Sequence, residues 1–320
     1  MSKTIKTLVA ASLLGAASLA HAAWPDRAVQ WVIPYPAGGG SDVIGRVVAS
    51  SLEKQLGQTI VVENKPGAAT IIGATYIQNA KPDGYVVGTA DSGTLAFNPS
   101  LYASLQYDPD QFTYIGGLAR FPLMLAVNES SPFKTVQDVI AAARENPDKL
   151  TSASAGAGSP HHLALEMFKQ RADVKITHVP YKGAAPALQD LLGGQVSIGF
   201  VDSAAGAANI KAGKLRVLAV ATPERLATLP DVPTMAEAGV QNFTAYAWQG
   251  LVGPADLPAQ VVDKLGADLQ TALKAPEVDE KIRAMGVEPM PMSASDFKAY
   301  AQAQQKEWAE VIKKADIKLD

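Results

Sequence analysis

The chain is predicted to fold as an α/β protein of two lobes, because of its length, its composition and the order of its hydrophobic patterns. A chain of 320 residues suggests about two domains. Hydrophobic residues make up 48% and charged residues 18%, which is enough apolar material for a core in each lobe. Strand-like runs alternate with helix-like runs, which is typical of parallel sheets covered by helices.

The alternation occurs twice along the chain. The first series has strands at 29–34, 59–62 and 85–90 and helices at 42–56 and 68–78. The second series has strands at 123–127, 150–153, 176–179, 196–201 and 215–221 and helices at 135–145, 160–171 and 184–192. A strand near 248–252 and helices at 258–274, 276–285 and 294–314 complete the chain.

Two crossovers between the lobes are expected, near Ala126-Val127 and near Val220-Ala221. The first lobe would then be discontinuous, formed by 23–126 and 221–320, and the second would be 127–220.

The N-terminus has the three parts of a secretory signal peptide. Lys3 and Lys6 precede an uncharged run at 7–19, and Ala20-His21-Ala22 supplies an A-x-A site. Residues 1–22 are therefore predicted to be removed on export, which places the mature protein in the periplasm. The apolar run is too short for a spanning helix. The chain has no cysteine, which excludes disulfides and a lipid anchor on cysteine.

Charge and motifs argue against several classes of partner. The formal net charge is −3 and no basic stripe is present, so nucleic acid is not an expected partner. Gly38 and Gly40 fit part of a dinucleotide-binding G-x-G-x-x-G pattern, but Val43 occupies the third position. No cofactor is expected.

The glycine-rich run at 35–42 is the first candidate for ligand binding. It follows a predicted strand and opens a predicted helix, and consecutive glycines let backbone N–H groups approach a ligand. A helix N-terminus adds partial positive charge, which suits a carboxylate or a phosphate. The alternative is a plain turn in which Ser41 or Asp42 caps the helix.

A second small-residue loop, at 154–162, stands in the same position in the second series. Ser159 is the expected N-cap, with Pro160 at the first helical position. His161 and His162 point in different directions on a helix, which argues against shared metal binding. His162 is expected to hydrogen-bond the loop backbone, and His161 to be exposed.

Further polar residues follow predicted strands, where open α/β sheets bind ligands, although each could also serve only in a cap or a turn. The complete set of predicted ligand-binding residues is Tyr35, Ala37, Gly38, Gly39, Gly40, Ser41, Asp42, Ser92, Thr94, Asn98, Ser154, Ala155, Gly156, Ser159, His162, Tyr181 and Asp202. No catalytic or metal-binding residue is predicted. The nucleophile pattern G-x-S-x-G is missing, and the loop residues hydrogen-bond well but do acid–base work poorly.

The chain resembles the solute-binding components of tripartite tricarboxylate transporters, the Bug proteins, over about 24–314. The motifs that carry the resemblance are W-P-D-R (24–27), P-Y-P-A-G-G-G-S-D (34–42), V-V-E-N-K-P-G-A (61–68), K-P-D-G-Y (81–85), S-A-G-A-G-S-P-H-H-L (154–163), H-V-P-Y-K-G-A-A-P-A-L-Q-D-L-L-G-G-Q-V (178–196) and L-P-D-V-P-T-M-A-E-A-G (229–239). Together, in this order and spacing, they are specific.

The resemblance implies a type II periplasmic binding fold, with two α/β lobes joined by crossover strands and a ligand cleft between them. It implies binding of a di- or tricarboxylate, an acidic amino acid or an aromatic acid, and delivery to the transporter's membrane subunits. The resemblance also implies that the loop at 35–42 holds a carboxylate through backbone groups and ordered waters, that the loop at 154–159 contributes from the other lobe, and that Asp202 matches an acid common at that place. Separately, the protein is expected to be a monomer. The chain departs from the family at Ala157, where many members carry a polar residue.

Three alternatives remain open at this point. The protein could be a periplasmic sensor that feeds a signalling system, an exported hydrolase, or a binding protein for an ABC importer.

Overall fold

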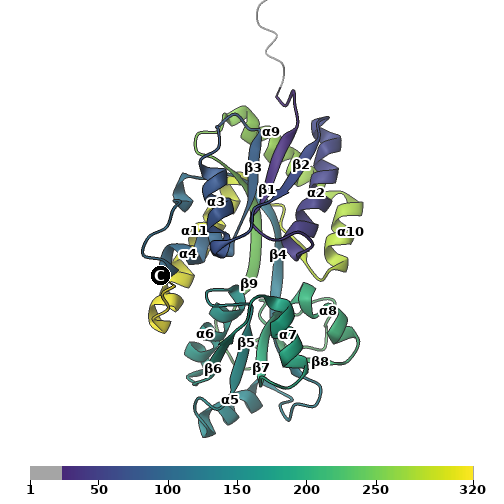
Figure 1. Cartoon of the computed structure of the whole chain (residues 1–320). Helices are drawn as coiled ribbons and strands as arrows, with labels where there is room; N and C mark the ends of the chain where they lie inside the picture. The colour runs from purple at the N-terminus through teal and green to yellow at the C-terminus, as the bar shows by residue number, and fades with distance from the viewer. Residues whose placement is uncertain (1–23, 320) are drawn as a thin grey trace, which may run out of the picture.

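A computed structural model describes residues 24–319 and shows two α/β lobes joined by two long strands, β4 and β9 (Figure 1). Their strands form one sheet in the order β2-β1-β3-β9-β4-β7-β5-β6, with β8 and β10 also paired to β4. The strands are β1 (Val29–Ile33), β2 (Ile60–Asn64), β3 (Val86–Asp91), β4 (Thr113–Asn128), β5 (Thr151–Ser154), β6 (Thr177–Pro180), β7 (Ile198–Asp202), β8 (Leu215–Val220), β9 (Tyr246–Gly253) and β10 (Glu288–Pro289).

Helices cover the sheet in both lobes, as the alternating pattern predicts. They are α2 (Gly40–Leu56), α3 (Ile71–Gln78), α4 (Asn98–Leu101), α5 (Val136–Glu145), α6 (Pro160–Ala172), α7 (Ala184–Leu192), α8 (Ser203–Lys211), α9 (Ala259–Lys274), α10 (Pro276–Ala284) and α11 (Ala294–Ala315). Within residues 24–319, none of these helices has the length and apolar character that crossing a membrane requires. The predicted signal peptide lies outside the described residues.

Each lobe contains its own block of parallel strands. In the first lobe β1 pairs in parallel with β2 and with β3. In the second lobe β5 pairs in parallel with β6 and with β7. The long strands β4 and β9 run antiparallel to their neighbours, so the sheet is mixed rather than wholly parallel.

Strand β4 is much longer than the predicted strand at 123–127. Its first part, Thr113–Pro122, pairs with β9, and its last part, from Leu123, pairs with β7 and β8. The first part was not predicted because glycines at Gly116 and Gly117 interrupt the strand pattern. The pairing with β9 shifts register at both places, as expected where a strand bulges.

We propose that the second crossover lies later in the chain than the predicted boundary at Val220-Ala221. The amide of Met235 donates to the carbonyl of Val220 at 2.9 Å, and the ring of Phe243 stacks on Phe200 of β7 with centroids 5.6 Å apart. These contacts favour assigning residues 221–245 to the second lobe, with the chain returning through β9 at Tyr246. This segment has few regular elements, so hydrophobic periodicity could not assign it. We propose 24–122 with 246–319 as the first lobe and 123–245 as the second.

Two further segments differ from the prediction. Helix α8 was not predicted, because its sequence S-A-A-G-A-A-N-I-K has little apolar periodicity. The predicted helix at 68–78 begins only at Ile71. It is preceded by three successive non-glycine residues with left-handed backbone angles, Ala68, Ala69 and Thr70, whose φ values are 44°, 48° and 77°.

Candidate functional site

The carboxyl ends of both parallel blocks converge on the junction between the lobes. Strand β7 ends at Asp202, which pairs with Leu123, the residue at which β4 enters the second lobe. Strand β3 ends at Asp91, which pairs with Gln249, close to the start of β9 at the same junction. Since β1 and β2 run parallel to β3, and β5 and β6 parallel to β7, the loops that follow these strands face the same region. The site predicted from sequence lies on these loops.

Asp42 fixes the shape of the glycine-rich loop in the first lobe. Its buried carboxylate accepts hydrogen bonds from the Gly38 amide at 2.9 Å, from Asn64 Nδ2 at 2.9 Å and from Arg46 Nε at 3.0 Å. Burial acts to raise the pKa of Asp42, but these donors outweigh burial and lower it. In the structure Asp42 therefore supports the loop from beneath.

The backbone at 36–40 is exposed, and α2 starts after Gly39 with no side-chain cap. The first N–H groups of a helix have no partner within the helix. A glycine at the N-cap leaves them open to a ligand. The loop can therefore present several donors and the positive end of α2 to an anion.

Asp91 and Gln249, which the sequence analysis did not single out, connect the predicted residues of the first lobe. Tyr35 donates its hydroxyl hydrogen bond to Asp91, and Ser41 Oγ donates to Gln249 Oε1 at 2.7 Å. Asp91 also accepts from the amide and the hydroxyl of Thr94, both at 2.8 Å. Burial of its hydroxyl and the nearby charge of Asp91 raise the pKa of Tyr35 well above its ordinary value, so the phenol stays protonated.

The left-handed turn at 68–70 is fastened by two predicted site residues. Asn98 Nδ2 donates to the carbonyl of Ala69 at 2.9 Å, and the hydroxyls of Thr94 and Thr70 lie 2.8 Å apart. Strained backbone of this kind is found more often at functional sites than elsewhere. The turn follows β2, so it lies at the same edge of the sheet as the glycine-rich loop. Ser92 Oγ, the remaining predicted residue here, is buried without a hydrogen-bond partner in the described part of the chain.

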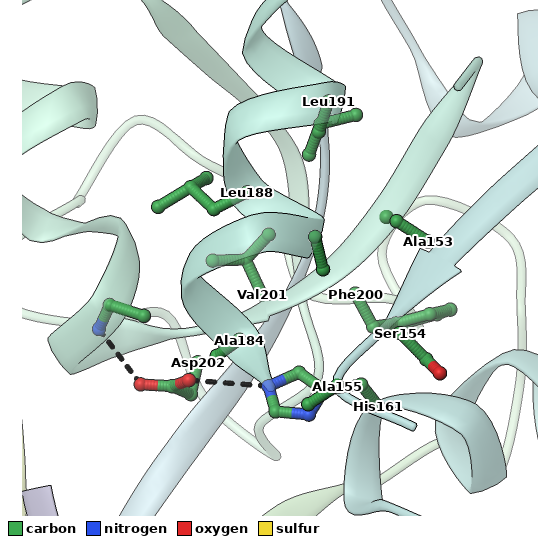
Figure 2. A pocket seen from close by; sticks show the side chains of 13 residues that line it. Ala153, Ser154, Ala155, His161, Ala184, Leu188, Leu191, Phe200, Val201 and Asp202 are labelled. Atoms are coloured by element: carbon green, nitrogen blue, oxygen red, sulfur yellow. Dashed lines mark hydrogen bonds and ion pairs between the residues drawn. The ribbon is translucent and has the colours of Figure 1, made fainter. Parts of the chain in front are cut away.

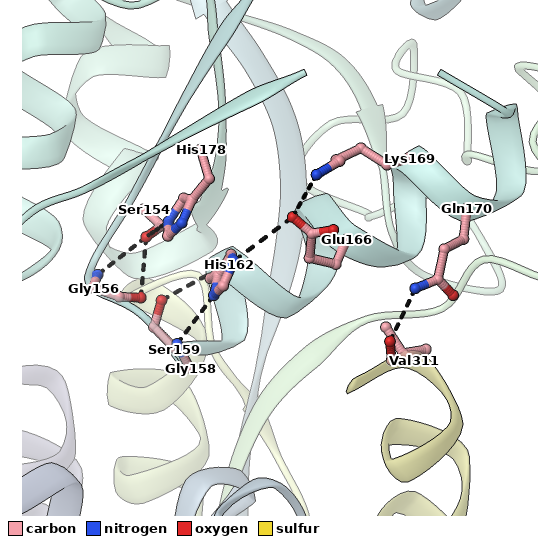
Figure 3. A network of polar contacts seen from close by, with 10 residues as sticks. All are labelled: Ser154, Gly156, Gly158, Ser159, His162, Glu166, Lys169, Gln170, His178 and Val311. Atoms are coloured by element: carbon pink, nitrogen blue, oxygen red, sulfur yellow. Dashed lines mark hydrogen bonds and ion pairs between the residues drawn. The ribbon is translucent and has the colours of Figure 1, made fainter. Parts of the chain in front are cut away.

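In the second lobe, Ser154 and two stacked histidines hold the loop at 154–159 (Figure 3). Ser154 Oγ lies 2.6 Å from His178 Nε2 and bonds both the amide and the carbonyl of Gly156 at 3.1 Å. The ring of His178 stacks on that of His162. Burial and the neighbouring His162 lower the pKa of His178 to about 4, so His178 is neutral at pH 7.

His162 supports the same loop from helix α6. Its Nδ1 accepts a hydrogen bond from the Gly158 amide at 3.1 Å, which confirms the predicted bond to loop backbone. Ser159 caps α6, also as predicted, by accepting from the His162 amide at 3.3 Å. On the far side Glu166 lies 3.7 Å from His162 Nε2 and 2.8 Å from Lys169 Nζ. Burial acts to raise the pKa of Glu166, but its partners His162 and Lys169 outweigh burial and lower it.

His161 is buried, contrary to the expectation that it is exposed. Its side chain turns toward the end of β7, where Nε2 lies 3.2 Å from Asp202 Oδ2 (Figure 2). Asp202 also caps α8 by accepting from the Ala205 amide at 2.8 Å. Burial acts to raise the pKa of Asp202, but His161 and the amide donors outweigh burial and lower it. The two residues thus form a pair at the carboxyl end of β7.

Tyr181 joins the second loop to helix α7. Its amide donates to the carbonyl of Ser154 at 3.0 Å, and its hydroxyl donates to Asp190 at 2.7 Å, which raises the pKa of the phenol to about 12. The Gly183 amide donates to the carbonyl of Ala155 at 3.1 Å. Helix α7 then starts after Gly183 with no side-chain cap, as α2 does in the first lobe.

The lobes touch each other away from the crossover strands. Ser203, at the start of α8, donates to the carbonyl of Gly286 in the first lobe. Gln170 of α6 donates to the carbonyl of Val311 in α11 at 2.9 Å (Figure 3). These contacts connect the two lobes outside the crossover strands. Across residues 24–319, no group of three His, Asp or Glu side chains is placed to hold a metal ion.

Comparison with known proteins places this geometry in a family. A family model described as "Tripartite tricarboxylate transporter family receptor" matches residues 44–317. A UPF0065 protein of Pseudomonas sp. (strain P51) is 36% identical over 267 residues, covering 83% of this chain and 79% of the relative. Protein BugT of Bordetella pertussis is 31% identical over 306 residues, covering 95% of this chain and 94% of BugT.

Solved structures agree with the fold. The Rpa4515 protein of R. palustris with adipate superposes with a TM-score of 0.84 at 35% identity, covering 92% of this chain and all of that one (100%). MatC of Rhodopseudomonas palustris with bound malate gives a TM-score of 0.80 at 31% identity, covering 90% and 100% of the two chains.

The lobes, the crossover strands and the facing loops are those of a two-lobed binding protein with a type II periplasmic binding fold. The chain belongs to the tripartite tricarboxylate transporter receptor family, the family that includes the Bug proteins. It is a solute-binding protein and not an enzyme, as the sequence analysis predicted.

Proposed function

We propose that this protein captures a small carboxylate-bearing solute in the cleft between its lobes. The observation that carries the proposal is the convergence of both parallel blocks on the lobe junction, where Asp91 and Asp202 end their strands. Two helices there, α2 and α7, begin after glycines without a side-chain cap. Uncapped helix N-termini favour anions.

The known structures of relatives support a carboxylate ligand. Their printed ligands are adipate and malate, both of which carry two carboxylates. The proposed contacts in this chain are the exposed backbone at 36–40, the hydroxyls near it, and the loops at 154–159 and 181–183 from the second lobe. Asp42 and His162 would act mainly by holding these loops, since they bond the amides of Gly38 and Gly158. Asn98 would hold the turn at 68–70, and Ser159 would cap α6.

Location and partners follow from the family. A related structure is described as the periplasmic binding protein BugD, and we propose that this chain too works in the periplasm after removal of residues 1–22. It would act as a monomer, because each copy carries both halves of the cleft. It would deliver its ligand to the membrane subunits of a tripartite transporter.

The test is titration of the mature protein with malate, adipate, citrate, glutamate and nicotinate, each compared with its amide. A true ligand at 100 times its dissociation constant adds about 2.7 kcal/mol to the free energy of unfolding. For a protein of this size, that raises the melting temperature by roughly 4–5 °C. Stabilisation by a carboxylate and none by its amide supports the proposal. Stabilisation only by neutral compounds would contradict the proposal that the ligand is a carboxylate.

Transport and sensing are separated by deleting the gene. Loss of uptake of the identified solute is the expected result. Intact uptake with loss of a transcriptional response would instead assign the protein to signalling.

A further inference from the structure

The segment that follows helix α11 turns back and packs between the two lobes. Asp316, the residue after the helix, has a left-handed backbone with a φ of 52°, which turns the chain away from the helix axis. Ile317 and Leu319 are half-buried after this turn, while Lys318 between them is exposed. The segment at 317–319 therefore directs two apolar side chains into the protein and one charge into solvent.

Helix α11 is packed on the first lobe, so the segment at 317–319 moves with that lobe. Trp308 of α11 packs edge-on against Phe97, with ring centroids 5.3 Å apart. Phe297 packs in the same way against Tyr114 at 5.5 Å and against Trp248 at 5.8 Å. Figure 1 shows the end of the chain beside α4 of the first lobe.

Leu319 contacts residues of both lobes. Its amide donates to the carbonyl of Leu101 at 2.9 Å, which fixes it to the end of α4. Its side chain and that of Leu101 both lie beside Gly158 of the second lobe. They are so close that a Cβ on Gly158 would come within 2.7 Å of Leu319 Cδ1 and 2.8 Å of Leu101 Cδ1. The two leucines thus form an apolar seat against the loop at 154–159.

This contact joins the two halves of the candidate site. Leu101 ends the helical segment that also carries Thr94 and Asn98, which fasten the left-handed turn in the first lobe. Gly158 belongs to the second-lobe loop, where its amide donates to His162. The leucine seat therefore links the loops of the two lobes directly, outside the crossover strands.

Further along α6, the boundary with α11 is more open. A groove with a volume of about 490 Å³ lies beside the bond between Gln170 and the carbonyl of Val311. Its other lining residues are charged, and they are Arg171, Glu307, Glu310 and Lys314. Charged side chains remain hydrated whether the lobes are near or apart, whereas separating an apolar contact exposes its surface to water at a cost in free energy. The contact at Gly158 is therefore suited to oppose separation of the lobes.

We propose that Leu319 is a positioning residue for ligand binding. With Leu101 it seats Gly158, favours the closed arrangement of the lobes and slows release of the bound solute. The inference rests on the proposed function, because it takes the cleft between the lobes as the place where the solute is held. Rotation of the lobes about β4 and β9 moves Gly158 away from the two leucines, and the loss of this contact opposes opening.

The distance between the lobes tests this inference without any ligand. The chain has no cysteine, so K54C on α2 and E145C on α5, both at exposed positions, give one spin-label site in each lobe of the mature protein. We expect L319A to shift the distances measured by pulsed electron paramagnetic resonance toward the open arrangement. The ratio of closed to open molecules should fall roughly 3- to 10-fold, as for the loss of part of a leucine contact.

Two matched variants accompany L319A. L319M keeps an apolar side chain of similar volume and should retain the wild-type distances. K318A changes the exposed neighbour of Leu319 and should also leave the distances unchanged. Melting curves report whether each variant is folded.

The release of malate and of adipate, followed by stopped-flow fluorescence in the unlabelled variants, is the second measurement. We expect L319A to raise the dissociation rate constant by a similar factor and to leave the association rate constant within about twofold. A lower melting temperature in L319A with unchanged distances and unchanged release would show that Leu319 only packs against the first lobe. That result would overturn the inference and leave the proposed function standing. Failure of wild type to bind any carboxylate in the wider panel would overturn the proposed function itself.

Discussion

The imidazole rings of His162 and His178 lie stacked, with centroids 3.7 Å apart and planes at 8° to each other. They join α6 to β6 beneath the loop at 154–159, because His162 bonds the amide of Gly158 and His178 contacts Ser154. Two protonated rings at this distance would repel each other, which ties the shape of the loop to pH.

Acidification should therefore destabilise the protein before most carboxylates are protonated. Burial and His162 lower the pKa of His178 from 6.5 to about 4. Between these two pH values, His178 is therefore protonated in the unfolded chain but not in the folded protein. The stabilisation is complete above about pH 6.5 and is lost as the pH falls toward 4. After allowing for solvent around this partly exposed side chain, we expect a loss of about 1–2 kcal/mol, measured by urea unfolding across this range.

H178Q is the matched variant, since its amide can still reach Ser154 and does not titrate. Its free energy of unfolding should change less between pH 6.5 and pH 4 than that of wild type. Equal pH dependence in the two proteins would contradict the assignment to His178.

Removal of the Asp42 carboxylate should destabilise the conformation of the glycine-rich loop at 35–42. D42A leaves Gly38, Asn64 and Arg46 without their common acceptor, and we expect a loss of about 2–4 kcal/mol together with weaker ligand binding. Arg46 is half exposed, so R46A should cost less than about 1 kcal/mol. Chemical unfolding of both variants measures these losses in the free energy of unfolding. Equal losses in D42A and R46A would show that Asp42 stabilises the protein only through its ion pair with Arg46, and not through the loop.

Gly158 occupies a position at which a side chain meets the first lobe. Its φ is +74°, and a Cβ would come within 2.7 Å of Leu319 and 2.8 Å of Leu101. We expect G158A to cost about 2–4 kcal/mol, through backbone strain and displacement of these two leucines. Gly213, just after α8, has a similar φ of +68° but open space around it, so G213A should cost only about 1 kcal/mol. Thermal melts of the two variants distinguish these effects. G213A reports the backbone strain alone, and the additional loss of stability in G158A reports the clash with Leu101 and Leu319.

The bond between Tyr35 and Asp91 should stabilise the first half of the cleft. Y35F removes one donor from the buried Asp91 carboxylate, which we expect to cost about 1–2 kcal/mol. Tyr85 makes a comparable bond to Asp26 near the surface, where water can replace it, and Y85F serves as the control with an expected cost below about 1 kcal/mol. If Y85F lowers the free energy of unfolding as much as Y35F does, the burial of Asp91 does not explain the loss in Y35F.

Much of the site could be predicted from local sequence pattern, because its loops follow strands that hydrophobic periodicity reveals. The polar loops after β1, β3, β5, β6 and β7 were all found in this way. Asp91 and Gln249 were missed for a different reason. Gln249 stands in the apolar run Y-A-W-Q-G-L-V-G, and its proximity to Ser41 arises only when β9 pairs with β3.

The same limit explains why the proposed lobe boundary differs from the predicted one, and why the expectation for His161 was wrong. We assign residues 221–245 to the second lobe because of contacts such as Phe243 on Phe200, which no local pattern encodes. The direction of the His161 side chain depends on where β7 ends relative to α6. Both are consequences of tertiary packing between elements far apart in the sequence.

With the lobe division proposed here, the two crossings at Leu123 and Ala245 enclose one uninterrupted stretch of chain that carries all the second-lobe loops of the site. Such a segment can be exchanged between relatives through only two junctions in the chain, and both junctions lie in neighbouring strands. Recombination within a gene family could then pair the first-lobe loops of one receptor with the second-lobe loops of another. New solute preferences would arise in this way without redesign of either core.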